Sequence, residues 1–471
     1  MSDGPLKDEK DLTMDERLER LQAERDHLRR FDEDRARRPG QLTPRQRVAA
    51  LVDDDSLIEI GAFAHSQYEE VGRGAPADGL IAGYARVDGR KIIVLAEDPL
   101  ALAQSDAQVA KAKRNRAINL GVYRSLPIVY LADGSETEYR AFDPNDALLM
   151  GRVAQQEPAR DISERRAPFV SVLFGVCSGQ DAALAIRADL IIATGDARLS
   201  AAGAGAPTLN AAVDRSASDE VEAVALARQF FALLPGTPKE ALTAQQAVEP
   251  PRPLGDDPDS SSQALLDGLV DAGSGLLLSG GSDPHRMGLG RIAGYPVAFT
   301  LTGEGAPLTA GDVRNLARIA AWSSRYRLPF LSAQDCAGYD PAEANQPGYL
   351  QAVASTVESL RTSAAPKISL ITGRGHAMGD FALGGKGTGF DFLWAWPAAD
   401  VGITDTRDYA ALQSGDSVAG PWQAADWGVV DDVIRPSESR EWIARGLGLL
   451  APMRGYPRLH ENRGMSLHDA T

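Results

Sequence analysis

The chain contains GYARVDGRKIIVL at residues 83–95 and, in its second half, GLGRIAGYPVAFTL at residues 288–301. Each copy starts at a glycine, turns at a second glycine and continues into an apolar run rich in strand-forming residues. The distance between the copies is far longer than the period of a solenoid repeat. The repeat therefore predicts two similar domains, each built around the same hairpin.

The same order of elements follows each copy. A helix pattern comes first, then a short apolar run that opens with Leu-Pro, and later another that opens with Ala-Pro. The helices are expected at residues 107–120 and 310–324, and the strands at residues 126–131, 167–173, 328–331 and 365–371. Strands that alternate with helices favour parallel βαβ units, so the expected fold class is α/β.

The remaining segments set the domain limits. Thr13 and Glu16 have the spacing of a capping box, which predicts an N-terminal helical arm within residues 1–48. Thr43 and Pro44 have the order of a helix start. The first domain is expected at residues 49–249 and a proline-rich linker with an entry helix at 250–283. The second domain takes residues 284–471.

Composition excludes several classes of protein. The chain has 471 residues, 44% of them hydrophobic, which is enough for more than one core. A net charge of -16 disfavours binding to nucleic acid or to an anionic membrane. Two cysteines are too few for a disulfide framework or a zinc ribbon, and no stretch has the length of a membrane span. We therefore expect a cytoplasmic protein without a metal site.

Each half also contains a strand that ends in a turn of small residues. These turns are FGVCSGQDA at residues 174–182 and TGRGHAMGD at residues 372–380. A helix that starts at such a turn presents unpaired backbone N–H groups at its positive end, which is the geometry of an oxyanion hole. The alternative is that glycine only permits a tight turn. The repetition in both halves favours a function.

Several segments, in this order, resemble the carboxyltransferase (beta) subunit of biotin-dependent acyl-CoA carboxylases of the propionyl-CoA and acetyl-CoA type. They are LTPRQR at 42–47, DCAGY at 335–339, APKI at 365–368, AWPA at 395–398 and AADWGVVDDVI at 424–434. The resemblance runs from about Leu42 to the end of the chain. It implies two tandem crotonase-like ββα-superhelix domains.

The resemblance also implies an activity and its partners. The first domain would bind an acyl-CoA or a carrier-bound acyl thioester, and the second would bind carboxybiotin that a separate carrier protein delivers. Carboxylate would move to the α-carbon through an enolate, without a side-chain base. The implied partners are biotin carboxylase and biotin carrier subunits, and the implied assembly is a homo-oligomer, a dimer or a trimer of dimers.

Site residues follow from the resemblance position by position. The backbone amides of the thioester hole would be those of Gly179 and Gln180, and those of the biotin-side hole would be Met378 and Gly379. The remaining assignments are Gly338, Tyr339, Ala377 and Phe381 for the cofactor, and Gly134, Ser135, Lys111 and Arg114 for the substrate.

The chain departs from the family pattern at these turns. Gly179-Gln180 and Ala377-Met378 stand where the family has glycine pairs, and residues 103–105 and 133–138 replace two further glycine motifs. Such changes suggest a changed substrate or chemistry, in which a side chain would move protons. The candidates for a side-chain acid or base are His376 and Asp380, followed by Asp181 and Glu136. The alternative for the aspartates is a role in capping, because aspartate is common at helix starts.

Two alternatives therefore stand beside carboxyl transfer. The first is a biotin-independent thioester enzyme, such as a decarboxylase or another enzyme of enolate chemistry, on the same fold. The second is a non-catalytic paralogue that serves as a structural subunit of a carboxylase complex. Cys177 is interpreted as a small buried thiol rather than a nucleophile.

Overall fold

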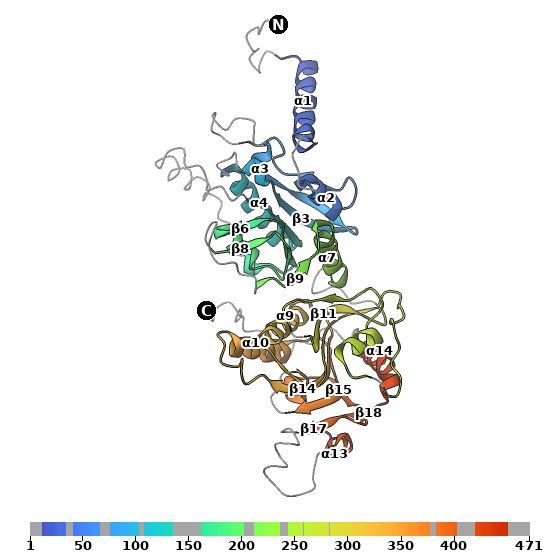
Figure 1. Ribbon diagram of the computed structural model, residues 1–471. Coiled ribbons are helices and arrows are strands. Elements are labelled where there is room, and N and C mark those ends of the chain that lie inside the picture. Colours follow the sequence, from blue (N-terminus) through green and yellow to red (C-terminus); the bar gives the residue numbers. More distant parts are fainter. Residues whose placement is uncertain are drawn as a thin grey trace. The chain divides into compact units, whose positions relative to one another are not determined.

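The structure is a computed structural model, and it describes residues 12–33, 41–65, 76–102, 108–134, 162–201, 212–235, 244–257, 259–281, 283–376, 383–402 and 420–450. Contacts divide the chain into two compact units (Figure 1). The first comprises residues 1–210 with 217–225, and the second comprises residues 211–216 with 226–471.

Two helices precede the first sheet, and both have the predicted caps. Helix α1 (Met14–Glu33) starts after Thr13, whose amide donates to Glu16 Oε2 at 2.8 Å while its hydroxyl accepts from the Glu16 amide at 3.3 Å. Helix α2 (Pro44–Leu51) has a capping box between Thr43 and Gln46 and proline in its first turn. The capping patterns in the sequence are confirmed in both places.

The first sheet has seven strands in the order β1-β2-β3-β4-β5-β7-β9. Their bounds are β1 Ile58–Glu59, β2 Leu80–Val87, β3 Arg90–Glu97, β4 Ile128–Ala132, β5 Phe169–Leu173, β7 Leu190–Thr194 and β9 Arg215–Ala217. Strands β2 and β3 form the predicted antiparallel hairpin, and β3, β4, β5 and β7 pair in parallel. Parallel strands are buried on both faces, which explains the continuous apolar run in β3.

Helices connect and cover these strands. They are α3 Pro99–Leu102, α4 Gln108–Arg124, α6 Gly179–Ala185 and α7 Glu220–Leu233, with 3-10 turns η3 Pro76–Gly79 and η4 Ile162–Glu164. A separate pair of short strands, β6 Val176–Ser178 and β8 Arg198–Ser200, lies in parallel beside the sheet's carboxyl edge. Helix α4 confirms the helix expected at residues 107–120, and it extends four residues further.

The second unit repeats this plan in a nine-stranded sheet with the main order β10-β11-β12-β14-β15-β16-β18. The strands are β10 Leu276–Leu277, β11 His285–Ile292, β12 Tyr295–Thr302, β13 Ala306–Leu308, β14 Phe330–Tyr339, β15 Lys367–His376, β16 Phe392–Ala395, β17 Asp400–Gly402 and β18 Asp432–Val433. Strands β11 and β12 form the second hairpin, and β12, β14, β15, β16 and β18 pair in parallel. The repeated hairpin and the α/β class are therefore confirmed.

Helices pack against this second sheet from two sides. They are α8 Ser262–Leu269, α9 Ala310–Tyr326, α10 Tyr349–Thr362, α13 Pro421–Asp426 and α14 Ser439–Leu450, with 3-10 turns η6 Lys386–Thr388 and η7 Pro436–Glu438. Figure 1 shows α9 and α10 together on one side and α14 on the other. One core joins Leu265 of α8, Phe299 of β12 and Ile443 of α14, each fully buried.

The division between the units lies near residue 225, ahead of the expected boundary at 249. Helix α7 starts in the first unit, and its last residues count with the second. There, Phe230 packs edge-on against Trp322 of α9, with ring centroids 5.2 Å apart. Residues 244–257 contain neither helix nor strand, as the proline-rich linker predicts. The domain limits taken from the sequence stay a prediction.

Candidate functional site

The predicted thioester turn lies at the carboxyl edge of the first sheet. After β6 the chain enters α6 at Gly179, whose φ is +57°, a conformation that favours glycine. A β-carbon built there would meet no atom within 4 Å, and both Gly179 and Gln180 are exposed. The Ser178 side chain makes no capping hydrogen bond. In the described part of the chain, the N-cap side chain therefore leaves the first amides of α6 available to an incoming oxygen.

Gly134, assigned to the substrate, lies beside this turn. Its amide donates to the carbonyl oxygen of Val176, the first residue of β6, at 2.8 Å. A β-carbon at Gly134 would lie 2.6 Å from the same oxygen, which is too close for any larger residue. The glycine thus lets the loop after β4 approach the strand that leads to Gly179.

A buried carboxyl lies beneath the turn. Strand β3 ends at Glu97, which is 5% exposed. The Tyr130 hydroxyl donates to Glu97 Oε1 at 2.5 Å, and the Asp133 amide donates to Oε2 at 3.1 Å. Burial, and after it the negative charge of Asp181, raises the pKa of Glu97 to about 8. The carboxyl is therefore mostly protonated at neutral pH, which is unusual outside functional sites.

Helix α4 supplies an arginine to the same place. Arg114 forms an ion pair with Asp181, the third residue of α6, and the two side chains are 12% and 18% exposed. Arg114 was assigned to the substrate, and the structure places it next to the thioester turn with a carboxylate as its partner. Lys111 is half-buried three residues earlier on α4. Lys113 is buried and donates to two backbone carbonyl oxygens.

A second ionic network supports the edge of the sheet. Arg47 of α2 donates to Asp133 Oδ2 at 2.5 Å and, through Nε and Nη2, to both carboxylate oxygens of Glu220 at 2.8 Å. Its guanidinium lies 4.1 Å from the centroid of the Phe174 ring. Burial raises the pKa of Asp133, against the effect of Arg47. This network joins α2 and α7 to the end of β4.

Cys177, two residues before Gly179, is 1% exposed. Burial, followed by the negative charges of Glu97 and Asp181, raises the pKa of its thiol. A thiol with a raised pKa carries almost no thiolate at neutral pH, and the thiolate is the nucleophilic form. The interpretation of Cys177 as a buried thiol is confirmed.

The second unit places the corresponding residues at the carboxyl ends of two neighbouring strands. Gly338 and Tyr339 end β14, and His376 ends β15, which pairs with β14 in parallel. Gly338 has a φ of +103°. The Tyr339 hydroxyl oxygen is buried, and it has no hydrogen-bond partner in the described part of the chain. Burial raises the pKa of this hydroxyl.

Several assigned residues lie outside the described part of the chain. These are Ser135 and Glu136 in the first unit, and Ala377, Met378, Gly379, Asp380 and Phe381 in the second. Strand β15 continues to His376, so the turn expected at residues 372–380 is wrong for residues 372–376, and residues 377–380 lie outside the described part of the chain. The roles assigned to all these residues stay predictions.

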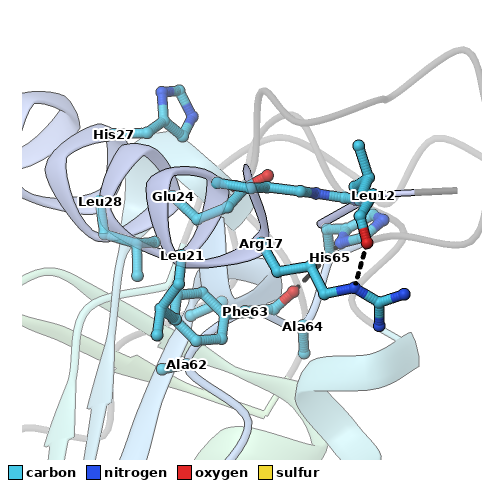
Figure 2. A pocket seen from close by; sticks show the side chains of 12 residues that line it. Leu12, Arg17, Leu21, Glu24, His27, Leu28, Ala62, Phe63, Ala64 and His65 are labelled. Atoms are coloured by element: carbon cyan, nitrogen blue, oxygen red, sulfur yellow. Dashed lines mark hydrogen bonds between the residues drawn. The ribbon is translucent and has the colours of Figure 1, made fainter. Parts of the chain in front are cut away.

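A pocket of about 410 Å³ lies elsewhere in the first unit, between α1 and residues 62–65 (Figure 2). Leu21 and Phe63 point toward one another in it, and the Arg17 Nε donates to the Leu12 carbonyl oxygen at 3.0 Å. Its lining mixes apolar and charged side chains, and it includes none of the site residues named from the sequence. We therefore place the candidate site of the first unit at the thioester turn and not in this pocket.

Sequence reasoning missed the buried polar residues around the first turn. Glu97 follows an apolar run directly, and Tyr130 stands inside one. A carboxylate at the end of a parallel strand is a signal for a site at the carboxyl edge, and this signal is present in the sequence. Arg114 and Asp181 were both named, but nothing in the sequence pairs them, because they are far apart in the chain.

Comparisons with known proteins show which family the whole chain resembles. The profile of the carboxyl transferase domain matches residues 35–220 and residues 210–412. The biotin-dependent acetyl-/propionyl-coenzyme A carboxylase beta5 subunit of Mycobacterium tuberculosis (strain CDC 1551 / Oshkosh) is 23% identical over 481 residues, with 87% of each chain covered. The putative propionyl-CoA carboxylase beta chain of Bacillus subtilis (strain 168) is 23% identical over 473 residues, with 88% of this chain and 91% of the relative covered.

Solved structures show the same fold. The transcarboxylase 12S hexamer, crystallised with hydrolysed methylmalonyl-coenzyme A, superposes with a TM-score of 0.78 at 19% identity and covers 96% of this chain and 99% of its own. A single-chain, multi-domain long-chain acyl-CoA carboxylase superposes with a TM-score of 0.71 at 23% identity, covering 92% of this chain and 48% of its own. The likeness extends over both units.

Proposed function

The chain belongs to the carboxyl transferase domain family, and from this premise we propose that it transfers a carboxylate group to the α-carbon of an acyl-CoA. The observation that carries the proposal is that the family profile covers both halves of the chain. The relatives named as acetyl- and propionyl-CoA carboxylase subunits indicate the class of substrate. They favour carboxyl transfer over a biotin-independent thioester enzyme and over a non-catalytic paralogue.

The first unit would hold the thioester. The carbonyl oxygen of the thioester would accept hydrogen bonds from the amides of Gly179 and Gln180. Both residues are exposed, and the N-cap side chain forms no competing hydrogen bond. Negative charge builds on this oxygen when the α-proton leaves, so the donors bind the enolate more strongly than the substrate. Gly134 would help to shape the thioester site, because a glycine at this position lets the loop after β4 lie close to β6.

The second unit would hold the biotin ring of a separate carrier protein. The buried Tyr339 hydroxyl, which has no partner within the described residues, is a polar group that a ureido ring could engage. Gly338, with its positive φ, keeps the approach free of a side chain. Biotin, in its carboxylated form, supplies the carboxylate. The amides of Met378 and Gly379 are proposed as the second set of donors.

Carboxyl transfer is tested by following a label. Labelled carboxylate on a biotin carrier is incubated with the protein and with acetyl-CoA or propionyl-CoA, and the expected product is a CoA ester that keeps the label after acid treatment. A reaction without the CoA ester is the control. Absence of label in both CoA esters, with a carrier that a proven carboxyltransferase accepts, would contradict the proposal.

The thioester hole is tested by removing one backbone donor. Gln180→Pro deletes an amide N–H in the first turn of α6, where proline fits a helix, while Gln180→Ala keeps the amide. We expect the proline variant to lose about 100-fold or more in kcat and the alanine variant to change little. Equal losses in the two variants would show that the side chain, and not the amide, contributes.

Assembly and location are also part of the proposal. The transcarboxylase 12S core is a hexamer, and we propose a homo-oligomer here, with biotin carboxylase and biotin carrier subunits as partners. Six chains of 50.1 kDa would give a particle of about 300 kDa by light scattering. In the described residues, no helix has the length and apolar character that crossing a bilayer requires. We propose a cytoplasmic location, which the two free cysteines support.

A further inference from the structure

The pocket between α1 and residues 62–65 has no part in the proposed function. Its volume of about 410 Å³ lies within the range of small-molecule sites. One wall is α1, the other is the segment from Ala62 to His65, and Ala77 completes the lining. Ala77 is 3% exposed, so the pocket reaches the buried part of the first unit. None of the residues proposed to act in carboxyl transfer lines it.

The apolar side chains of the pocket are only partly covered. Leu21 and Leu28 are seven residues apart on α1, so they share one face of the helix, and both are half-buried. Phe63, on the opposite wall, is 47% exposed and points toward Leu21 (Figure 2). Removal of such apolar surface from water is favourable. These side chains therefore favour a ligand with an apolar body.

The polar side chains that line the pocket are all ionisable. Four are basic and one is acidic, namely Arg17, Arg20, His27 and His65 against Glu24. This excess of basic residues contrasts with the net charge of -16 of the whole chain. The described residues of the lining include no amide or hydroxyl side chain, which are the groups that recognise a base or a sugar. The lining therefore favours an anionic head group.

The pocket has a basic end and an apolar interior. Figure 2 shows Arg17 and His65 near Leu12 at one end, whereas Leu21 and Phe63 lie further along α1. Arg17 Nε donates to the Leu12 carbonyl oxygen at 3.0 Å, and His65 Nδ1 donates to the Phe63 carbonyl oxygen at 3.2 Å. Each of these hydrogen bonds holds a basic side chain at that end. A ligand with a charged head and an apolar tail matches this arrangement.

We propose that the pocket binds a medium-chain fatty carboxylate, with its carboxylate at Arg17 and His65 and its alkyl chain between Leu21 and Phe63. The planar guanidinium of an arginine matches a carboxylate with two parallel hydrogen bonds. Arg20, three residues after Arg17, lies on the same face of α1 and adds a second positive charge near the head group. The site goes beyond the proposed function and does not depend on it.

The test is titration calorimetry on the full-length protein with decanoate as the probe. Between Arg17 and Leu28, α1 rises by about 16 Å, which is enough for the chain of decanoate. Each methylene that enters the pocket should lower Kd by about fourfold. Hexanoate should therefore bind more weakly than decanoate by about 10-fold or more.

Four variants locate the ligand. Arg17→Met should raise the Kd of decanoate about 5-fold, as expected for an exposed ion pair. Phe63→Ala should raise it about 10-fold, because the chain loses its contact with the ring. Glu24→Gln removes the acidic group of the lining and should lower Kd, a result that damage to the fold cannot produce. The matched control is Arg25→Met, on an exposed arginine of α1 outside the lining, and its Kd should stay unchanged.

Three results would overturn the inference. The first is no binding of decanoate, or the same Kd in the unmodified protein, Arg17→Met and Phe63→Ala. The second is binding of AMP but not of decanoate, which would identify a nucleotide site. The third is displacement of decanoate by propionyl-CoA, which would make the pocket part of the substrate site. Carboxyl transfer is measured separately with labelled carboxylate, so the proposed function can stand or fall without this site.

Discussion

Arg47 shows how a single buried charge can organise one edge of a sheet. It is 1% exposed, and its guanidinium serves two carboxylates on different elements, Asp133 after β4 and Glu220 on α7. A buried ion pair gains little over an apolar substitute, but removal of one partner leaves the other charges uncompensated. The same reasoning applies to Glu97, whose neutral form avoids a charge in a buried place.

Arg47→Met should therefore destabilise the first unit strongly. We expect a loss of about 3–5 kcal/mol in the free energy of unfolding, because two carboxylates lose their cation. Urea unfolding monitored by circular dichroism measures it. The control is Arg45→Met, because Arg45 forms an ion pair with Glu59 and its side chain is 31% exposed. Loss of this pair should lower the free energy of unfolding by about 1 kcal/mol or less. Similar losses in the two variants would contradict the importance of the buried network.

Glu97 should make stability depend on pH. Its pKa is raised from 4.5 to about 8, so the folded state binds one more proton than the unfolded state between these values. The contribution of Glu97 to the free energy of unfolding is therefore fully present below pH 4.5. It falls as the pH rises to about 8, by up to about 1.4 kcal/mol per pH unit. Glu97→Gln should flatten this part of the curve in urea unfolding between pH 5 and 9. Parallel curves for the two proteins would exclude the raised pKa.

At the scale of elements, the glycine that opens each repeat has the same structural role. Gly83 in β2 lies opposite Glu59 of β1, and Gly288 in β11 lies opposite Leu277 of β10. A β-carbon would lie 2.4 Å from a β1 carbonyl oxygen in the first case and 2.1 Å from a β10 carbonyl oxygen in the second. Each short edge strand thus depends on a glycine in its neighbour. This explains why glycine recurs there in a strand that otherwise favours larger residues.

Gly288→Ala should consequently destabilise the second unit. The added methyl group meets a backbone oxygen, which cannot move aside as a flexible side chain can, so we expect a loss of about 1–3 kcal/mol. The control is Gly255→Ala in the linker, where nothing lies within 4 Å of the added carbon. Thermal unfolding should show a lower midpoint for the first variant and an unchanged or slightly higher one for the second. An unchanged midpoint in Gly288→Ala would mean that β10 moves away at no cost.

At the scale of the whole molecule, each compact unit contains most of one sheet. The second has a core of large apolar side chains between its sheet and α8 and α14. The first buries β4 and β5 completely, and β3 from Ile92 to Glu97. Two units of this kind can unfold separately, so the chain is not expected to behave as one cooperative system.

Scanning calorimetry should therefore resolve more than one transition, with a calorimetric enthalpy larger than the van't Hoff enthalpy. Arg47→Met should lower the midpoint of one transition and Gly288→Ala that of another, because the two residues belong to different units. A single transition that both variants shift equally would show that the units unfold together.

Most of the fold follows from the sequence because its determinants are local. The hairpin at Gly89, the caps at Thr13 and Thr43 and the short apolar runs opened by Pro127 and Pro329 depend on neighbouring residues in the chain. The structure confirms each of these elements. The resemblance over both halves added the class of activity, and the family profile confirmed it.

The order of the strands and the electrostatics of the site depend instead on contacts between distant residues. Only the folded chain brings Glu97 to Tyr130, Arg114 to Asp181, and Arg47 to both of its carboxylates. The pKa of a carboxyl depends on what surrounds it, and residues far apart in the chain form that surrounding here. The sequence by itself thus determined the two α/β units and the position of the first turn, while the tertiary structure decided which side chains meet beneath that turn.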